Sequence, residues 1–469
     1  MPGALRASFA PGSSLTVTLV CQASLLVETR GVRILSDPWY EGRIYGDAWE
    51  LCPPPPAWPE VGRLDAIYLS HAHPDHFHVP TLRRLLPIVG AEVAVLVPQL
   101  VFPVMRDALS SLGYRNVIEM APGRAFEFKG VRLFCQQYRF NDSLLVVQGD
   151  ETLVNLNDCP VRGATLRDLA RRFPRVDYVF AQYAVAQAYP FAYESATGDW
   201  DAGDLIERFD SYARALSPRH LVPFASFVRF CHADNAHMNG HRTTLDALVE
   251  RSAARLTVLY PGDALEGDAV TRAPGSAERY REAVAQGAAT APAGAPAREE
   301  LERRLPAFLA GLRRDVPAFL RRRVPRAAFA FADAPGGVVL DLAAGTFAFA
   351  DALPFATSPD LPLAYALSTR TLLEAVSSPW GWSNLQIGAK FRARVEPGWE
   401  AREYAFWAVP MLGLEGYLRV ASLWFLRPRS LRVAWGRRAE LFEYARRALG
   451  GSFVSDVVRS KADYETPRT

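Results

Sequence analysis

The feature that most constrains this chain is a cluster of histidines that directly follows an apolar run. Residues 70–78 have the sequence SHAHPDHFH and hold four of the eight histidines in the chain, right after the run LDAIYL. A short apolar run bounded by polar residues predicts a buried strand. The histidines are therefore expected at a strand end, where a sheet brings polar side chains from several strands to one edge.

The spacing inside this cluster predicts two pairs of metal ligands. His71 and His73 are two residues apart in extended chain, so their imidazoles project from the same side. Pro74 biases His73 toward extended geometry and turns the chain, so that Asp75 and His76 approach from another direction. We interpret H-x-H-x-D-H as the spacing of a site for two neighbouring metal ions.

Composition excludes several classes of protein. The 53 basic residues nearly balance the 50 acidic ones, which gives no electrostatic case for a nucleic-acid partner. No stretch approaches 18 apolar residues, so no transmembrane segment is expected. The five cysteines form no C-x-x-C pair, which favours reduced thiols in a cytoplasmic protein. At 469 residues the chain is too long for one ordinary core.

The pattern along the chain predicts an α/β domain followed by a smaller one. Strand-like and helical runs alternate up to residue 284, as in a layered α/β domain. Residues 285–297 are Ala, Gly, Pro, Gln and Thr without charge and cannot bury enough surface to fold. We therefore predict a catalytic domain over 1–284, a linker over 285–300 and an α+β domain over 301–469.

The histidine cluster also resembles a known family. LSHAHPDH is similar to the signature of the metallo-β-lactamase superfamily, whose fold is an αββα sandwich with two metals at the strand ends. The stretches ILSDPWYEG, LVNLNDCP, FAQYAVAQAYP, VPFASFVRFCH and LYPGD resemble the metallo-β-lactamase-like domain of CMP-N-acetylneuraminate hydroxylases and their bacterial relatives. The resemblance implies the αββα fold for the first domain.

The resemblance also implies a ligand set. It makes metal ligands of the four residues of the motif, and Asp158 in NLNDC becomes the carboxylate that bridges the two cations and offsets their repulsion. The final histidine should follow LVPFASFVRF, which nominates His232, with His237 next. The implied ligands are His71, His73, Asp75, His76, Asp158, His232 and His237.

One position departs from the family pattern. Ordinary hydrolases of the superfamily take a third histidine from the hairpin before the bridging aspartate, but no histidine occurs between His78 and His220. Asp142 or Asn141 fills the place, or the first metal keeps only two histidines. An oxygen ligand in place of an imidazole makes the site a harder ligand set, which favours metal ions that prefer oxygen ligands. Two histidines with one carboxylate are the arrangement with which iron activates dioxygen.

Other residues are candidates for supporting the metal ligands or for lining a substrate pocket. Asp37 in SDPW is expected either to support a metal-ligating histidine or to form a turn before Pro38. We count it with Asp75 and Asp158 among the carboxylates that take part in catalysis. Several aromatic side chains either wall a substrate pocket or belong to the core; they are Trp39, Tyr40, Trp49, Tyr183, Tyr189 and Tyr193.

For the C-terminal region the sequence indicates only an architecture. The order of hairpin, helix and the Trp-rich turn at Trp380 and Trp382 resembles small sterol-carrier-like domains that accompany some metallohydrolases. The resemblance implies an apolar-ligand, dimerisation or lid role. The oligomeric state stays open, and a homo-oligomer is compatible with the sequence.

These observations favour an enzyme with two metal ions that acts on a small molecule. A diiron oxygenase is favoured narrowly; the alternative is a zinc or manganese hydrolase of an ester, lactone, amide or phosphodiester, and a metal-binding scaffold without turnover is the third hypothesis. The sialic acid hydroxylases carry a Rieske cluster, which needs paired C-x-H and C-x-x-H ligands. Cys231 and His232 are adjacent, so electrons are expected from a donor protein or from the substrate.

Overall fold

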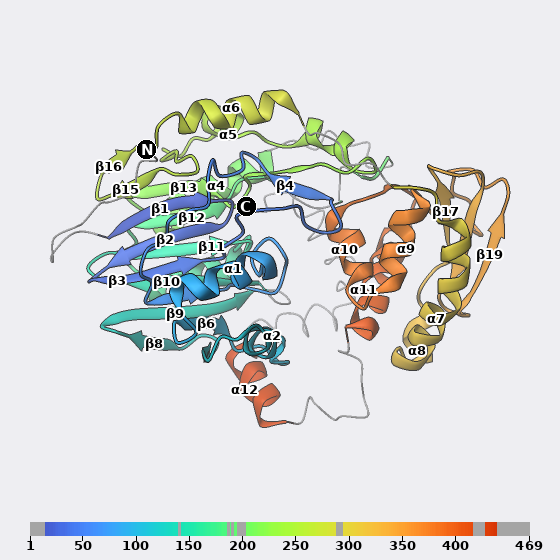
Figure 1. Ribbon diagram of the computed structural model, residues 1–469, viewed down its shortest axis with the longest axis horizontal. Helices are drawn as coiled ribbons and strands as arrows, with labels where there is room; N and C mark the ends of the chain where they lie inside the picture. The colour runs from blue at the N-terminus through green and yellow to red at the C-terminus, as the bar shows by residue number, and fades with distance from the viewer. Residues whose placement is uncertain are drawn as a thin grey trace.

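The computed structural model (Figure 1) describes residues 15–138, 142–184, 188, 192–194, 203–287, 294–415 and 427–438. Asn141, Tyr189, part of the predicted linker and the end of the predicted 301–469 domain lie outside these residues. Within them, no helix is long and apolar enough to cross a membrane.

The first sheet has eight strands and a parallel half. Its order is β16 (Ala269–Thr271), β15 (Ala264–Glu266), β1 (Thr16–Cys21), β2 (Ser24–Thr29), β3 (Val32–Ser36), β5 (Ala66–Tyr68), β6 (Ala94–Pro98) and β7 (Asn116–Met120). Strands β3, β5, β6 and β7 run parallel. All three residues of β5 are buried, as the apolar run before the histidines predicts.

The second sheet has six strands, in the order β13 (His220–Phe224), β12 (Tyr178–Gln182), β11 (Thr152–Asn157), β10 (Asp142–Gln148), β9 (Val131–Tyr138) and β8 (Ala125–Phe128). Strands β11, β12 and β13 are parallel, so their carboxyl ends meet at one edge. Side chains from both sheets form one core, for example Leu25 and Tyr68 from the first and Leu145 and Val154 from the second.

Helices cover the outer faces of the two sheets. On the first sheet, α1 (Val79–Val89) and α2 (Val104–Leu112) bury Leu82, Leu85 and Leu109. On the second, α3 (Gly163–Arg172) and α4 (Gly203–Leu216) lie against the common core, together with α5 (Leu245–Arg251) and α6 (Ser276–Gln286). The expected αββα sandwich is confirmed.

A smaller C-terminal α+β domain lies beside the sandwich (Figure 1). We use this name for residues 294–415. Its sheet has the order β19 (Thr346–Ala350), β18 (Gly337–Asp341), β17 (Ala327–Phe331), β20 (Leu363–Leu367) and β21 (Arg392–Val395). Its helices are α7 (Arg298–Asp315), α8 (Ala318–Arg321), α9 (Thr369–Ser377), α10 (Gly381–Gly388) and α11 (Glu400–Leu414). Buried Trp382 and Trp407 pack against each other with ring centroids 5.1 Å apart and ring planes tilted by 41°.

The chain returns to the sandwich after this domain. In α12 (Pro428–Gly436), the Arg429 guanidinium donates to the Glu119 carboxylate at the end of β7 and to the carbonyl of Leu100. Helix α7 begins at Arg298, inside the range predicted for the linker. The predicted domain limits and the apolar-ligand, dimerisation or lid role stay predictions.

Candidate metal centre

The histidine loop is held at the carboxyl end of β5 by hydrogen bonds from its backbone. The Ser70 amide donates to Asp37 Oδ1 over 2.8 Å, and the Ser70 carbonyl accepts from Ser143 Oγ over 2.6 Å. Around Pro74, the amides of His76 and Phe77 both donate to the carbonyl of His73, which closes a turn. The loop is therefore fixed to both sheets before α1 begins.

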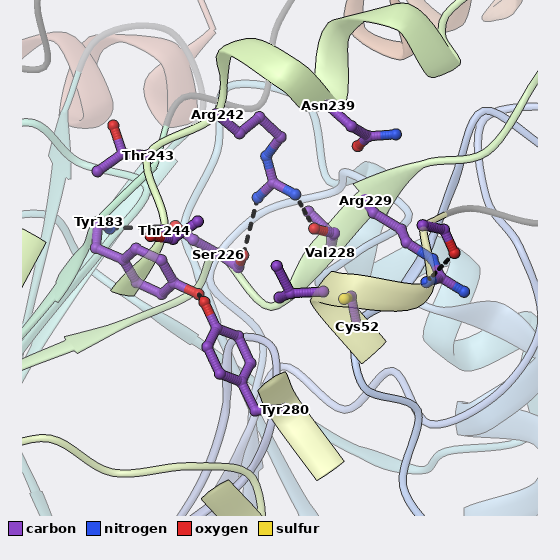
Figure 2. Close-up of a pocket in the computed structure, with 12 residues that line it drawn as sticks. Cys52, Tyr183, Ser226, Val228, Arg229, Asn239, Arg242, Thr243, Thr244 and Tyr280 are labelled. Atoms are coloured by element: carbon purple, nitrogen blue, oxygen red, sulfur yellow. Dashed lines mark hydrogen bonds between the residues drawn. The ribbon is translucent and has the colours of Figure 1, made fainter. Parts of the chain in front are cut away.

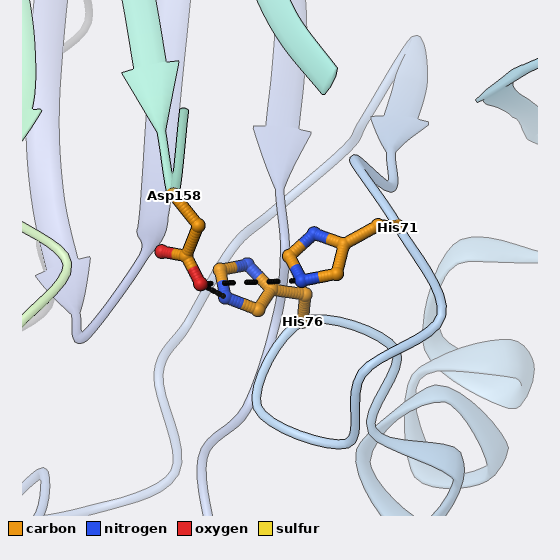
Figure 3. A group of neighbouring side chains, drawn as sticks. All are labelled: His71, His76 and Asp158. Atoms are coloured by element: carbon orange, nitrogen blue, oxygen red, sulfur yellow. Dashed lines mark ion pairs between the residues drawn. The ribbon is translucent and has the colours of Figure 1, made fainter. Parts of the chain in front are cut away.

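This turn brings two groups of ligand atoms together. In one group, drawn in Figure 3, the potential metal-ligating atoms of His71, His76 and Asp158 lie within 4.8 Å of one another. In the other, His71, His73 and Asp142 meet the same limit. His76 Nε2 lies 3.3 Å from Asp158 Oδ2, and His71 Nε2 lies 3.8 Å from Asp142 Oδ1. The two groups share His71, so they describe two adjacent positions for cations.

Two polar atoms in this cluster are buried without a hydrogen-bond partner. They are His76 Nε2 and Asp158 Oδ1, although His76 Nε2 is 3.0 Å from Asp75 Oδ2. Buried polar atoms without partners are rare because they lose their hydration without compensation. A cation bound by His76 Nε2 would provide that compensation for the imidazole, so the residues present fit a metal site.

The electrostatics of the histidines suit ligand chemistry. Burial and the neighbouring rings hold the pKa of His71 well below its usual value, and burial lowers the pKa of His73. Burial disfavours the charged form of His76, but Asp75 and Asp158 raise its pKa well above the ordinary value. Burial alone would raise the pKa of Asp75, yet the charge of His76 lowers it to about 2. The cluster therefore holds a proton on His76 where a cation would replace it.

Asp37 lies directly behind His76, where we predicted a supporting carboxylate. Its Oδ2 is 3.2 Å from His76 Nδ1 and accepts from Asn157 Nδ2 over 2.6 Å. A carboxylate on Nδ1 fixes the ring orientation and leaves Nε2 free for a metal. Asp37 and Asn157 both have positive φ, 40° and 51°, a strained conformation that places their side chains toward the ligands.

Tyr45 is a further residue at the cluster that our sequence analysis missed. Its hydroxyl donates to Asp75 Oδ1 over 2.8 Å, and its side chain is 3% exposed. Thirty residues separate the two partners, and no local spacing links them. The only signal is the turn sequence YGD after Ile44, which predicts a bend but not its neighbour.

The described groups do not include His232 or His237, which we predicted as ligands. Strand β13 ends at Phe224, and Ala225, which follows it, has no ligand atom. The chain then forms β14 (Val228–Phe230), which pairs with β4 (Trp49–Leu51). There His232 Nδ1 accepts from the Asp234 amide over 3.1 Å, and burial, together with the charge of Lys390 in the C-terminal domain, lowers the pKa of His232.

The aromatic residues predicted near a pocket are buried. Trp39, Tyr40 and Trp49 are at most 4% exposed and belong to the core beneath α1 and the histidine loop. Tyr183 lines a cavity of about 90 Å³ (Figure 2), where its hydroxyl lies 3.4 Å from that of Tyr280. None of the residues around this cavity belongs to the ligand groups. Burial thus favours the core interpretation for Trp39, Tyr40 and Trp49, whereas Tyr183 lines a cavity apart from the ligand groups.

Comparison with known proteins agrees with the fold. Residues 32–152, which include the histidine cluster and Asp142, match the family model of the beta-lactamase superfamily domain. The chain therefore carries a domain of that superfamily, and the resemblance seen in the sequence is confirmed.

Curated relatives match about half of this chain. A Mycobacterium tuberculosis protein named as a Rieske 2Fe-2S iron-sulfur protein is 27% identical over 48% of this chain and 46% of its own length. The cytidine monophosphate-N-acetylneuraminic acid hydroxylase of Danio rerio is 23% identical over 56% and 45%. The chain thus matches less than half the length of these relatives.

Two solved structures are also similar to this chain. The diiron β-hydroxylase CmlA from Streptomyces venezuelae is 20% identical over 45% of both chains, with a TM-score of 0.33. The isothiocyanate hydrolase from Delia radicum gut bacteria is 15% identical over 53% of this chain and 98% of its own, with a TM-score of 0.38. Likenesses of this size do not distinguish a hydroxylase from a hydrolase.

Proposed function

We propose that the protein is a binuclear metalloenzyme, and specifically a diiron oxygenase that hydroxylates a small molecule. The proposal rests on the observation that a carboxylate oxygen of Asp142 lies near the ring nitrogens of His71 and His73, in one group of potential ligand atoms. Two imidazoles with one carboxylate favour iron with open coordination positions, whereas a third imidazole would suit zinc.

In this proposal, each ion has its own residues. His71, His73 and Asp142 would hold the first, Asp75 and His76 would hold the second, and Asp158 would be shared by both. Iron ions bound there would supply the redox chemistry that dioxygen activation requires. The protein orients and insulates the ligands: Asp37 holds the His76 ring through Nδ1, and the buried ligands exclude water on the side of the core.

The relatives support oxidation over hydrolysis. One is named as a hydroxylase and another as a Rieske iron-sulfur protein, and they match 56% and 48% of this chain. Hydroxylation inserts one oxygen atom into a C–H bond and reduces the other to water, which consumes a pair of electrons and two protons. The five cysteines here lack the C-x-H and C-x-x-H spacing of a Rieske centre, so in this proposal a donor protein or the substrate would supply those electrons.

Dioxygen uptake tests the proposal. The metal-free protein is loaded anaerobically with ferrous iron or with zinc, and each form is mixed with dioxygen and a chemical reductant. We expect uptake in proportion to bound iron, none with zinc, and none in an iron-treated His76→Ala variant. Iron-loaded protein that consumes no dioxygen, together with a zinc form that hydrolyses esters, lactones or phosphodiesters, would instead establish the hydrolase.

A further inference from the structure

The loop that carries Tyr45 has an unusual backbone. Tyr45, Gly46 and Asp47 have φ values of 54°, 62° and 60°, three successive residues in the left-handed region. Residues other than glycine adopt this region at a cost and persist there only when their surroundings hold them. The loop closes on itself through the Ala48 amide, which donates to the Ile44 carbonyl over 2.9 Å. Further support must come from elsewhere in the molecule.

That conformation directs the Tyr45 side chain to the metal ligands. Its ring packs on Trp49, with centroids 4.9 Å apart, and its hydroxyl donates to Asp75 Oδ1. The other oxygen, Asp75 Oδ2, lies 3.0 Å from His76 Nε2. The Tyr45 hydroxyl is thus hydrogen-bonded to one carboxylate oxygen of Asp75. The other oxygen stays beside His76, on the side where a cation would bind.

The missing support comes from the C-terminal domain. Lys390 Nζ donates to the carbonyl of Gly46 over 2.8 Å and pairs with Glu374 Oε2 over 2.7 Å. Lys390 is 3% exposed. A buried ammonium is costly unless its hydrogen bonds are made. The C-terminal domain therefore places one of its few buried charges on the backbone of this loop.

A second contact fixes the other end of the loop. Asn235 Nδ2 donates to the carbonyl of Ala48 over 3.0 Å and to that of Gly388 over 2.7 Å, so one amide joins the two domains. At Gly388 the backbones approach so closely that a β-carbon there would lie 2.9 Å from Ala48 Cβ and 3.2 Å from Tyr45 Cβ. Only glycine fits between the domains at this point.

We propose that Tyr45 is a positioning residue of the metal centre and that the C-terminal domain, through Gly388 and Lys390, holds it against Asp75. The C-terminal domain is then a structural part of the metal centre, whereas a lid or an independent carrier module would leave the centre intact without it. This inference rests on the proposed metal-binding function and extends it, because it assigns a role to a domain that contributes no ligand.

Cobalt(II) binding to the full-length protein tests the inference without any substrate. Tyr45→Phe keeps the ring on Trp49 and removes the hydroxyl from Asp75. Loss of a hydrogen bond to a ligating residue typically weakens metal binding about 10- to 100-fold. We expect a loss in that range for one cobalt site, with a change in its visible absorption. Tyr114→Phe is the matched control, because it also removes a buried phenol hydroxyl, in this case from the Leu82 carbonyl.

A double-mutant cycle tests the role of the C-terminal domain. Lys390→Met removes the ammonium that donates to the Gly46 carbonyl. Gly388→Ala adds a β-carbon that displaces Tyr45. Each variant is expected to weaken the same cobalt site as Tyr45→Phe. If Lys390 acts through Tyr45, Lys390→Met has little further effect on cobalt affinity in the Tyr45→Phe background. Arg298→Met, which removes the exposed ion pair with Asp351, is the control within this domain.

The outcomes separate the two proposals. A wild-type protein that binds no cobalt would refute the metal-binding function and this inference with it. Two cobalt sites in the wild type that Tyr45→Phe leaves unchanged would refute the inference alone. Additive losses from Tyr45→Phe and Lys390→Met would show that Lys390 does not act through Tyr45 and would overturn the role given to the C-terminal domain.

Discussion

Replacement of Asp37 by asparagine should weaken both the fold and the metal centre. The Asp37 side chain is buried and has three neighbours that donate to it: the Ser70 amide at 2.8 Å, Asn157 Nδ2 at 2.6 Å and His76 Nδ1 at 3.2 Å. In Asp37→Asn the remaining oxygen keeps the Ser70 amide, and a new NH₂ group faces the other two donors. Each of those two must find another acceptor or lose its hydrogen bond.

The expected magnitude follows from these contacts. Asn157 has an unpartnered buried Oδ1, so its amide can turn and accept from the new NH₂ group. The Nδ1–H of His76 is left with Ser70 Oγ, 3.5 Å away at the limit of hydrogen bonding, and a buried donor without a good acceptor costs about 1–3 kcal/mol. Metal affinity should fall about 10- to 100-fold because the ring is no longer held. That loss corresponds to about 1.4–2.7 kcal/mol of binding free energy.

Urea unfolding of the metal-free protein measures the first quantity, and cobalt titration measures the second. Asp263→Asn is the matched control, because Asp263 is also fully buried and accepts from the amides of Tyr260 and Ala273, which lie outside the ligand groups. The control should lose stability and keep its metal affinity. An Asp37→Asn variant with wild-type metal affinity would refute the claim that Asp37 orients a ligand.

Three further predictions concern the ligands. Because the pKa of His76 is raised in the metal-free protein, a metal ion must displace the proton on this imidazole. The apparent cobalt affinity should therefore fall about tenfold per pH unit as the pH decreases below that pKa. Cobalt titrations at several pH values measure this slope, and an affinity that does not change with pH would contradict the prediction. His232→Ala should keep the full metal content by mass spectrometry, because His232 belongs to neither of the described ligand groups; loss of one ion would support His232 as a ligand. Asp142→His should raise the ratio of zinc to iron in protein from cells supplied with both, and an unchanged ratio would argue against Asp142 as the residue that selects iron.

The parts of the site that could be predicted from the sequence are those with local geometry. His71, His73, Asp75 and His76 lie within six residues, so strand periodicity and one proline were enough to expect them together. The αββα sandwich was implied by the family resemblance, whereas the pattern of strand-like and helical runs by itself predicted only a layered α/β domain.

What could not be predicted depends on contacts between distant segments. Tyr45 reaches Asp75 only because a left-handed loop is held by Lys390, 344 residues away from the Gly46 carbonyl that it contacts. The sequence places His232 after the apolar run of β13, but the structure inserts β14, which pairs with β4, before it, and the described ligand groups do not include His232. Local sequence does not specify such a turn, because the partner strand and the C-terminal domain select it.

Metal analysis with Mössbauer spectroscopy tests the central claim most directly. The protein is purified from cells supplied with both iron and zinc, beside an Asp158→Ala variant that removes the carboxylate between the two ions. The account predicts about two irons per chain in an antiferromagnetically coupled pair, and loss of that coupled signal in the variant. Two zinc ions per chain, with iron absent even when offered, would contradict the diiron assignment.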